Sequence, residues 1–184
     1  FRPEWLRRYE PSELVLERLV TLMAVDPATG VSGGDYFALW VGSVDESTGV
    51  IYTRQLTLER IGIVEQVQRI VAAFEQWRPV KVGIETVAYQ AALKQILEEE
   101  SRRRGLYMPL VGIATTANKR ARIEGSAAFY ANGLFRLPPT LDSECEQQFL
   151  HFPKARHDDA PDVCAMGIEL ARALAAGTRI DGAA

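Results

Sequence analysis

Two short apolar runs, Val20–Asp26 (VTLMAVD) and Val80–Glu85 (VKVGIE), each end in an acidic residue. Runs of this length beside turn residues are typical of buried strands, and burying an unpaired acid is costly. In open α/β sheets, ligands bind at the carboxyl ends of the strands. If the two strands are parallel neighbours, their ends lie about 4.8 Å apart, so that both carboxylates reach one small site.

The rest of the apolar pattern places further elements around these runs. A hairpin is expected at 36–44 and 50–57, and a helix begins near Ile63 and ends before Pro79. Further elements are expected as helices at 88–104, 118–131, 141–151 and 160–176, a strand at 108–114, and a short extended piece at 134–138. This order predicts an α/β fold: a mixed five-stranded sheet, its first three strands an antiparallel meander, flanked by helices on both faces.

Length and composition indicate one globular domain. The chain has 184 residues, of which 47% are hydrophobic, and a formal net charge of −3, which suits a single sizeable core. We expect a linker or N-terminal arm over residues 1–18, the folded domain over 19–178 and a disordered tail over 179–184. No apolar run approaches the roughly 18 residues of a membrane span, and the charged start is not a signal peptide, so a cytoplasmic protein without a membrane partner is expected.

Three aspartates, Asp158, Asp159 and Asp162, crowd the segment HDDAPD at the head of an apolar helix. Two interpretations are open. Asp159 before Ala160 and Pro161 suits a helix N-cap, which explains one aspartate well and three badly. Crowded carboxylates also repel one another unless a cation is shared between them, which favours a metal or catalytic site. With only two histidines and two cysteines in the chain, carboxylates are the plentiful ligands, and they favour magnesium or manganese.

A cationic cluster, Lys119, Arg120 and Arg122, stands at the start of a predicted helix. Such clusters are usually solvated surface. In a protein that binds nucleic acid, the same residues contact phosphates and position the duplex without reading its sequence. If the chain binds nucleic acid, we expect these three residues to contact the DNA backbone.

Four segments carry a resemblance to a known family: VDPATGVSGGDYFALWVG, GIETVAYQAAL, TTANKRARIEGSAAFYANGLFRLP and HDDAPDVCAMG. In this order they resemble the nuclease domain of the large terminase subunit of tailed bacteriophages, an RNase H-like, RuvC-type nuclease. The similarity spans about residues 20–175. It implies an RNase H-like nuclease domain at 19–178, with residues 1–18 as the interdomain connection.

The resemblance also implies an activity and a site. It implies an endonuclease that cleaves double-stranded, concatemeric viral DNA during genome packaging through two Mg²⁺ or Mn²⁺ ions. Asp26, Glu85 and Asp159 would be catalytic: Asp26 would bridge both metals, Glu85 would bind one, and the acids of 158–162 would bind the other. RuvC-type sites often use two positions three apart, which matches Asp159 and Asp162, and the role of Asp158 stays open.

The implied partners are double-stranded DNA, the packaging ATPase domain of the same subunit, the portal and the small terminase subunit, in the host cytoplasm. The ATPase signature GxxxxGK[ST] does not occur in this sequence. The alternative is a non-catalytic nucleic-acid-binding or assembly module on an RNase H-like fold. A phosphotransferase of the actin and sugar-kinase type would need a longer, duplicated chain.

Overall fold

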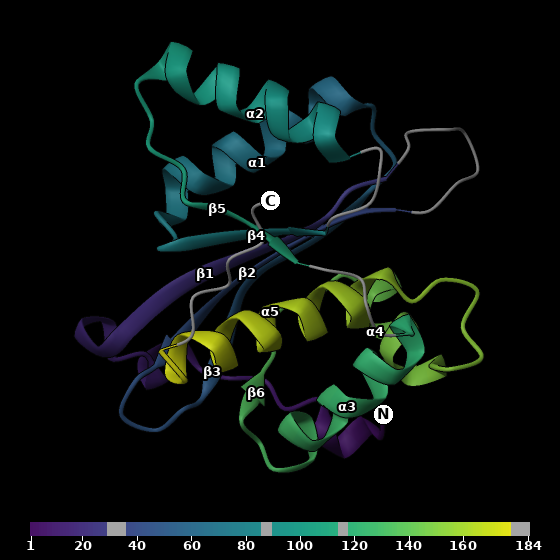
Figure 1. The fold of residues 1–184 in the computed structure, drawn as a ribbon. Helices are drawn as coiled ribbons and strands as arrows, with labels where there is room; N and C mark the ends of the chain where they lie inside the picture. Colours follow the sequence, from purple (N-terminus) through teal and green to yellow (C-terminus); the bar gives the residue numbers. More distant parts are fainter. Residues whose placement is uncertain (29–35, 86–89, 114–117, 178–184) are drawn as a thin grey trace.

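The computed structural model describes residues 1–28, 36–85, 90–113 and 118–177, and of 90–92 the backbone alone. These residues form a six-stranded sheet with helices on both faces (Figure 1). The elements in chain order are β1 (Leu19–Asp26), β2 (Phe37–Asp45), β3 (Ile51–Glu59), α1 (Ile63–Trp77), β4 (Lys81–Glu85), α2 (Gln90–Arg104), β5 (Leu110–Ile113), α3 (Lys119–Ala131), β6 (Phe135–Arg136), α4 (Ser143–His151) and α5 (Asp159–Ala175). None of these described helices has the length and apolar character needed to cross a membrane.

The strands lie in the order β5-β4-β1-β2-β3-β6. β1 pairs antiparallel with β2 and parallel with β4, and β2 pairs antiparallel with β3. The expected mixed sheet with an antiparallel meander is therefore confirmed. It has one strand more than the five expected, because β6 pairs with the start of β3. Two residues are too few for a periodic pattern to indicate a strand.

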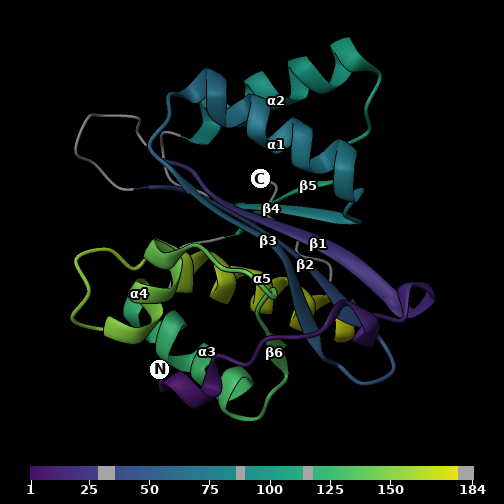
Figure 2. The ribbon, with the colours of Figure 1, turned by 180° about the vertical axis from the view of Figure 1, so that it is seen from behind.

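β1 is covered on both faces of the sheet. Leu22 and Ala24 pack in one core with α5, whereas Met23 and Val25 pack in the other core with α1 and α2. Figures 1 and 2 show the two layers, α1 and α2 on one face and α3, α4 and α5 on the other. A strand buried on both faces has no polar side, which explains why its sequence is a continuous apolar run.

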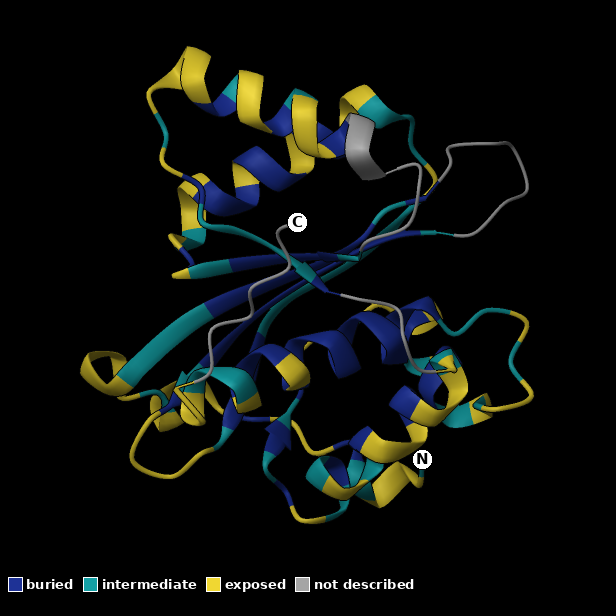
Figure 3. Ribbon diagram, viewed as in Figure 1, coloured by how far each residue is buried: buried dark blue, intermediate teal, exposed yellow. Residues whose placement is uncertain are grey.

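Helix α5 lies close against the sheet, and most of its length is buried (Figure 3). The fully buried indole of Trp40, in β2, donates a hydrogen bond from Nε1 to Oγ1 of Thr53 (3.0 Å). A Cβ atom at Gly167 of α5 would clash with this indole, and so would one at Gly42 of β2. Glycine at these two positions therefore leaves room for the indole of Trp40 between β2 and α5. This packing fixes the position of α5 on the sheet.

The N-terminal segment packs on the α3 and α4 side of the domain. The ring of Phe1 lies 4.8 Å from that of Tyr130 and 5.2 Å from that of Phe149, between ring centroids. Leu6 and Tyr9 are buried. Residues 1–9 thus belong to the packed structure, while the role of residues 1–18 as an interdomain connection stays a prediction.

Candidate active site

Asp26 and Glu85 end two neighbouring parallel strands at one edge of the sheet. β1 and β4 are paired in register up to the residues just before these acids, so both side chains leave the sheet at the same level. Helix α5 begins at this edge, on the right of Figure 1, and carries Asp159 and Asp162 in its first turn. Three segments far apart in sequence therefore bring carboxylates to one place, as the sequence predicts.

The carboxyl group of Asp26 is buried beside that of Glu85. Burial raises the pKa of Asp26, and the Glu85 carboxylate raises it further through its charge and a hydrogen bond. The ionised form of Asp26 is therefore disfavoured beside Glu85. A pair of carboxylates this close is stable only when a proton or another cation is shared.

Lys119 begins α3 and lies among the three aspartates of α5. Its Nζ atom is 2.8 Å from Oδ1 of Asp158, 3.4 Å from Oδ1 of Asp159 and 3.5 Å from Oδ2 of Asp162. Burial alone would lower the pKa of Lys119, but the aspartates outweigh it and raise that pKa. The ammonium group thus stays charged and offsets part of the repulsion between the aspartates.

Arg122 lies one turn further along α3, on the same helix face as Lys119. Its Nε donates to Oδ1 of Asp162 (2.8 Å), and its Nη2 donates to Oδ2 of Asp162 (2.9 Å) and to Oε1 of Glu85 (3.2 Å). Arg122 and Asp162 are only 8% and 1% exposed. This guanidinium therefore joins α3, α5 and the end of β4.

A second group of side chains, which the sequence did not indicate, lies beside Asp159. The guanidinium carbon of Arg60 is 4.0 Å from the ring centroid of Tyr36, and its Nη2 is 3.4 Å from Nε2 of His157. Nδ1 of His157 is in turn 3.8 Å from Oδ2 of Asp159. His157 directly precedes Asp158 in the sequence, and this position could have indicated it. The position of Arg60 depends on how the end of β3 packs, which the sequence does not indicate.

The pattern of a known family matches most of this chain. The model of the family described as "Terminase RNaseH-like domain" matches residues 23–170. The chain belongs to this family. A search of curated protein sequences gave no match.

Solved structures share the fold of this terminase domain. The P22 large terminase nuclease domain is 12% identical with a TM-score of 0.66, and the match covers 94% of this chain and 90% of that one. The human cytomegalovirus terminase nuclease domain is 11% identical with a TM-score of 0.65, and the match covers 89% of each chain. The magnesium-bound large terminase nuclease of the thermophilic phage G20c is 16% identical with a TM-score of 0.58, and the match covers 89% and 84%. The expected RNase H-like fold is confirmed.

Helix capping does not account for the aspartates of this terminase domain. Asp158, not Asp159, takes the cap position of α5, and its side chain makes no capping hydrogen bond. The backbone N–H of Ala160, near the start of α5, donates instead to Oε1 of Gln148 in α4 (2.9 Å). The alternative that placed Asp159 at the cap is therefore wrong, because a neighbouring helix supplies the acceptor.

The carboxylate cluster is richer in negative than in positive groups. It consists of Asp26, Glu85, Asp158, Asp159 and Asp162. Its ion-pair partners are Lys119 and Arg122, with His157 at the rim. Excess hard oxygen donors fit Mg²⁺ or Mn²⁺. Among the described residues, no three acidic, histidine or cysteine side chains are grouped as a metal site requires.

The three cations predicted to bind DNA are divided by the structure. Lys119 and Arg122 are paired with acids of the cluster. Arg120 lies on the exposed side of α3, where its Nε is 2.8 Å from Oε1 of Glu124. DNA binding by these three residues stays a prediction, and Arg120 has the exposure that a backbone contact requires.

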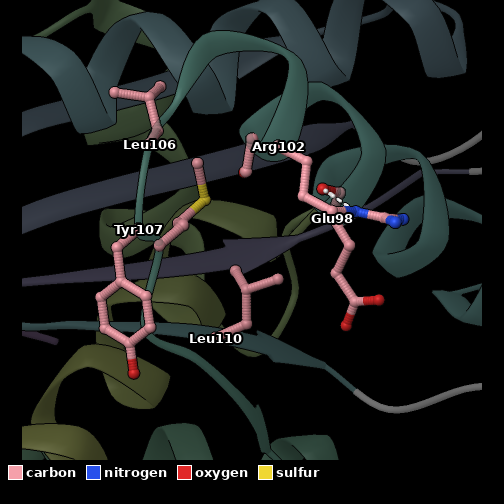
Figure 4. A pocket seen from close by; sticks show the side chains of 7 residues that line it. Glu98, Arg102, Leu106, Tyr107 and Leu110 are labelled. Atoms are coloured by element: carbon pink, nitrogen blue, oxygen red, sulfur yellow. Dashed lines mark hydrogen bonds between the residues drawn. The ribbon is translucent and has the colours of Figure 1, made fainter.

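A separate cavity of about 290 Å³ lies where α2 ends and β5 begins (Figure 4). Leu106, Met108 and Leu110 form its apolar part, and the exposed Tyr107 stands at its edge. α2 begins at the end of the sheet that carries the acids and is 15 residues long, so the cavity is about 20 Å from the site edge. It is therefore not part of the active site.

Proposed function

We propose that this domain is a divalent-metal-dependent endonuclease that cleaves double-stranded viral DNA during genome packaging. The observation that carries the proposal is the convergence of carboxylates from β1, β4 and α5 at one sheet edge. Family membership supports a nuclease role in DNA packaging. Structures of relatives hold magnesium, cobalt or zinc, and one was soaked with manganese, which supports a divalent metal here.

In this proposal Asp26, Glu85 and aspartates at the head of α5 supply the carboxylates that would hold the divalent ions. Such ions would supply an activated water as the nucleophile and would stabilise the charge of the leaving oxygen of a phosphodiester. The protein residues prepare the site: Asp26 lies beside Glu85 at the strand ends, and Arg122 holds Glu85 in place. Lys119 offsets the charge of the aspartates until the ions bind.

Plasmid cleavage tests this function. We expect the domain to nick or linearise supercoiled DNA with Mg²⁺ or Mn²⁺, with little sequence preference, and to be inactive with EDTA. Full activity in EDTA would contradict the metal mechanism. DNA binding without cleavage, with either metal and with the packaging ATPase domain present, would favour the non-catalytic module. The ATPase domain, the portal and the small terminase subunit are proposed as partners through the family.

The rim residue Arg60 joins Arg120 as an expected contact to the DNA backbone. Each lost phosphate contact flattens the plot of log affinity against log salt by about 0.9 units, so Arg60→Ala and Arg120→Ala should each do so on unrelated duplexes. Binding is measured in EDTA to prevent cleavage. Arg103→Ala is the control, because this exposed arginine lies at the far end of α2 and pairs with Glu100. Slopes as steep as that of the control would show that neither residue contacts phosphate. Alanine variants of Lys119 and Arg122 are tested by the same plot.

A further inference from the structure

We propose that Asp162 is not a metal ligand: it forms with Arg122 a buried ion pair that positions Glu85, and the metal ligands are Asp26, Glu85 and Asp159. Asp158 then lies at the outer edge of the site. This inference rests on the proposed function in that it assumes metal binding. It gives each of the three aspartates of HDDAPD a different role.

Both oxygens of Asp162 already have a strong partner. Arg122 donates to Oδ1 at 2.8 Å and to Oδ2 at 2.9 Å, the bidentate geometry in which arginine binds carboxylates best. A metal ion on either oxygen would lie close to the guanidinium, away from water. Two positive charges at that separation repel strongly in a buried site.

Lys119, which pairs with both Asp158 and Asp159, is held less firmly than Arg122. Lys119 reaches Asp159 at 3.4 Å and Asp158 at 2.8 Å, and its side chain is 36% exposed on a flexible stem. The flexible stem leaves this ammonium group a route into solvent. The guanidinium of Arg122, whose side chain is 3% exposed, has no such route. Asp159 is therefore the buried acid of α5 that an ion can reach.

The charged residues on the two helices have the same spacing. Lys119 and Arg122 are three residues apart on α3, and Asp159 and Asp162 are three residues apart on α5. Lys119, the exchangeable cation, lies within 3.5 Å of all three aspartates, whereas Arg122, the fixed cation, pairs with Asp162 and Glu85. The spacing that resembles a pair of ligands is thus also the spacing of one ligand and one ion pair.

Arg122 acts on the metal through Glu85. Its Nη2 lies 2.9 Å from Asp162 and 3.2 Å from Glu85, so Asp162 fixes the guanidinium and the guanidinium orients the Glu85 carboxylate. Arg122 is in this sense a positioning residue. Groups that orient metal ligands typically change metal affinity by about 10–100-fold when they are removed.

The test compares Asp162→Asn with Asp159→Asn by Mn²⁺ calorimetry and by thermal unfolding in EDTA. We expect Asp162→Asn to lower the melting temperature by about 5 °C or more, because it leaves a buried arginine without its main partner. Its Mn²⁺ affinity should stay within about tenfold of the wild type, the low end of effects on groups behind the ligands. Asp159→Asn should keep the melting temperature and lose more than about 100-fold in Mn²⁺ affinity.

Two further variants show whether the pair acts as a unit. Arg122→Lys keeps the charge without the fork and should recover part of the stability and the Mn²⁺ affinity that Arg122→Gln loses. The double variant Arg122→Met with Asp162→Leu replaces the pair by apolar groups and should melt above Asp162→Asn, and it should still bind Mn²⁺.

The outcomes separate the two ideas. Wild-type protein that binds no Mn²⁺ would contradict the proposed function and, with it, the assignment of ligands. In a second outcome the wild type binds Mn²⁺, but Asp162→Asn and the double variant abolish that binding, as Asp159→Asn does. This result would leave the proposed function standing and would overturn the exclusion of Asp162 from the ligands.

Discussion

Asp26→Asn is expected to abolish DNA cleavage and to raise the melting temperature of the metal-free protein. The buried Asp26 carboxylate is destabilised beside Glu85, and asparagine removes its charge while keeping a donor for the hydrogen bond to Glu85. Asparagine is a poor ligand for both ions, so the rate should fall by about 10³-fold or more, equal to about 4 kcal/mol. Cleavage rates with Mn²⁺ and melting temperatures in EDTA check both halves. Cleavage near the wild-type rate, or a lower melting temperature in EDTA, would contradict the role of Asp26.

The same variant should change how stability depends on pH. Because the pKa of Asp26 is raised, the folded protein keeps a proton that the unfolded chain releases. This stabilisation is complete below the unfolded pKa and is lost as pH rises through the folded pKa. The free energy of unfolding in EDTA should therefore fall across that interval in the wild type, and less so in Asp26→Asn.

Asp45→Asn is a control of opposite sign. Hydrogen bonds from the hydroxyl and the N–H of Ser47 lower the pKa of Asp45, so its stabilisation is present above the unfolded pKa and is lost as pH falls. This aspartate lies at the end of β2, away from the carboxylate cluster. We expect Asp45→Asn to lower the melting temperature at neutral pH and to leave cleavage unchanged.

Trp40→Ala is expected to lower the free energy of unfolding by about 3–5 kcal/mol. The indole is fully buried between β2 and α5, and the neighbouring Gly42 and Gly167 have no side chains to fill the space it leaves. Thr53 would also lose its hydrogen-bond donor. Since domains are stable by only about 5–15 kcal/mol, this loss is large, and urea denaturation measures it.

The control for this prediction is Trp77→Ala. Trp77 is only partly buried, with its Nε1 bonded to Gln55 (2.9 Å), so its loss should cost about 1–2 kcal/mol. Equal losses for the two tryptophans would show that α5 does not depend on the Trp40 indole.

The sequence predicted that these acids lie close together because their positions follow from the sheet, while their role as metal ligands stays a prediction. Val20–Asp26 and Val80–Glu85 are apolar runs covered on both faces, and parallel pairing of their strands puts both terminal acids at one edge. The first turn of α5 then reaches the same edge, as the order of elements requires.

The partners of those acids could not be predicted in the same way. Whether Lys119 and Arg122 face solvent or carboxylates depends on how α3 packs against α5, about 40 residues further along the chain. Arg60 joins the rim through Tyr36 and His157, which no local pattern connects. The capping interpretation failed for a similar reason, since the acceptor for Ala160 is Gln148 of another helix.

The two helical layers differ in what they contribute to the site. Of the helices, α3 and α5 supply charged side chains to the site, whereas α1 and α2 pack apolar residues under β1 and β4. Gln66 of α1 donates to the carbonyl of Ala28 (2.8 Å). Outward-facing positions of α1 and α2 lie across the sheet from α3 and α5 (Figure 2). Fluorescent labels placed there would report on DNA and metal binding without displacing a carboxylate. Tags placed there would attach the protein to a surface with the site left open.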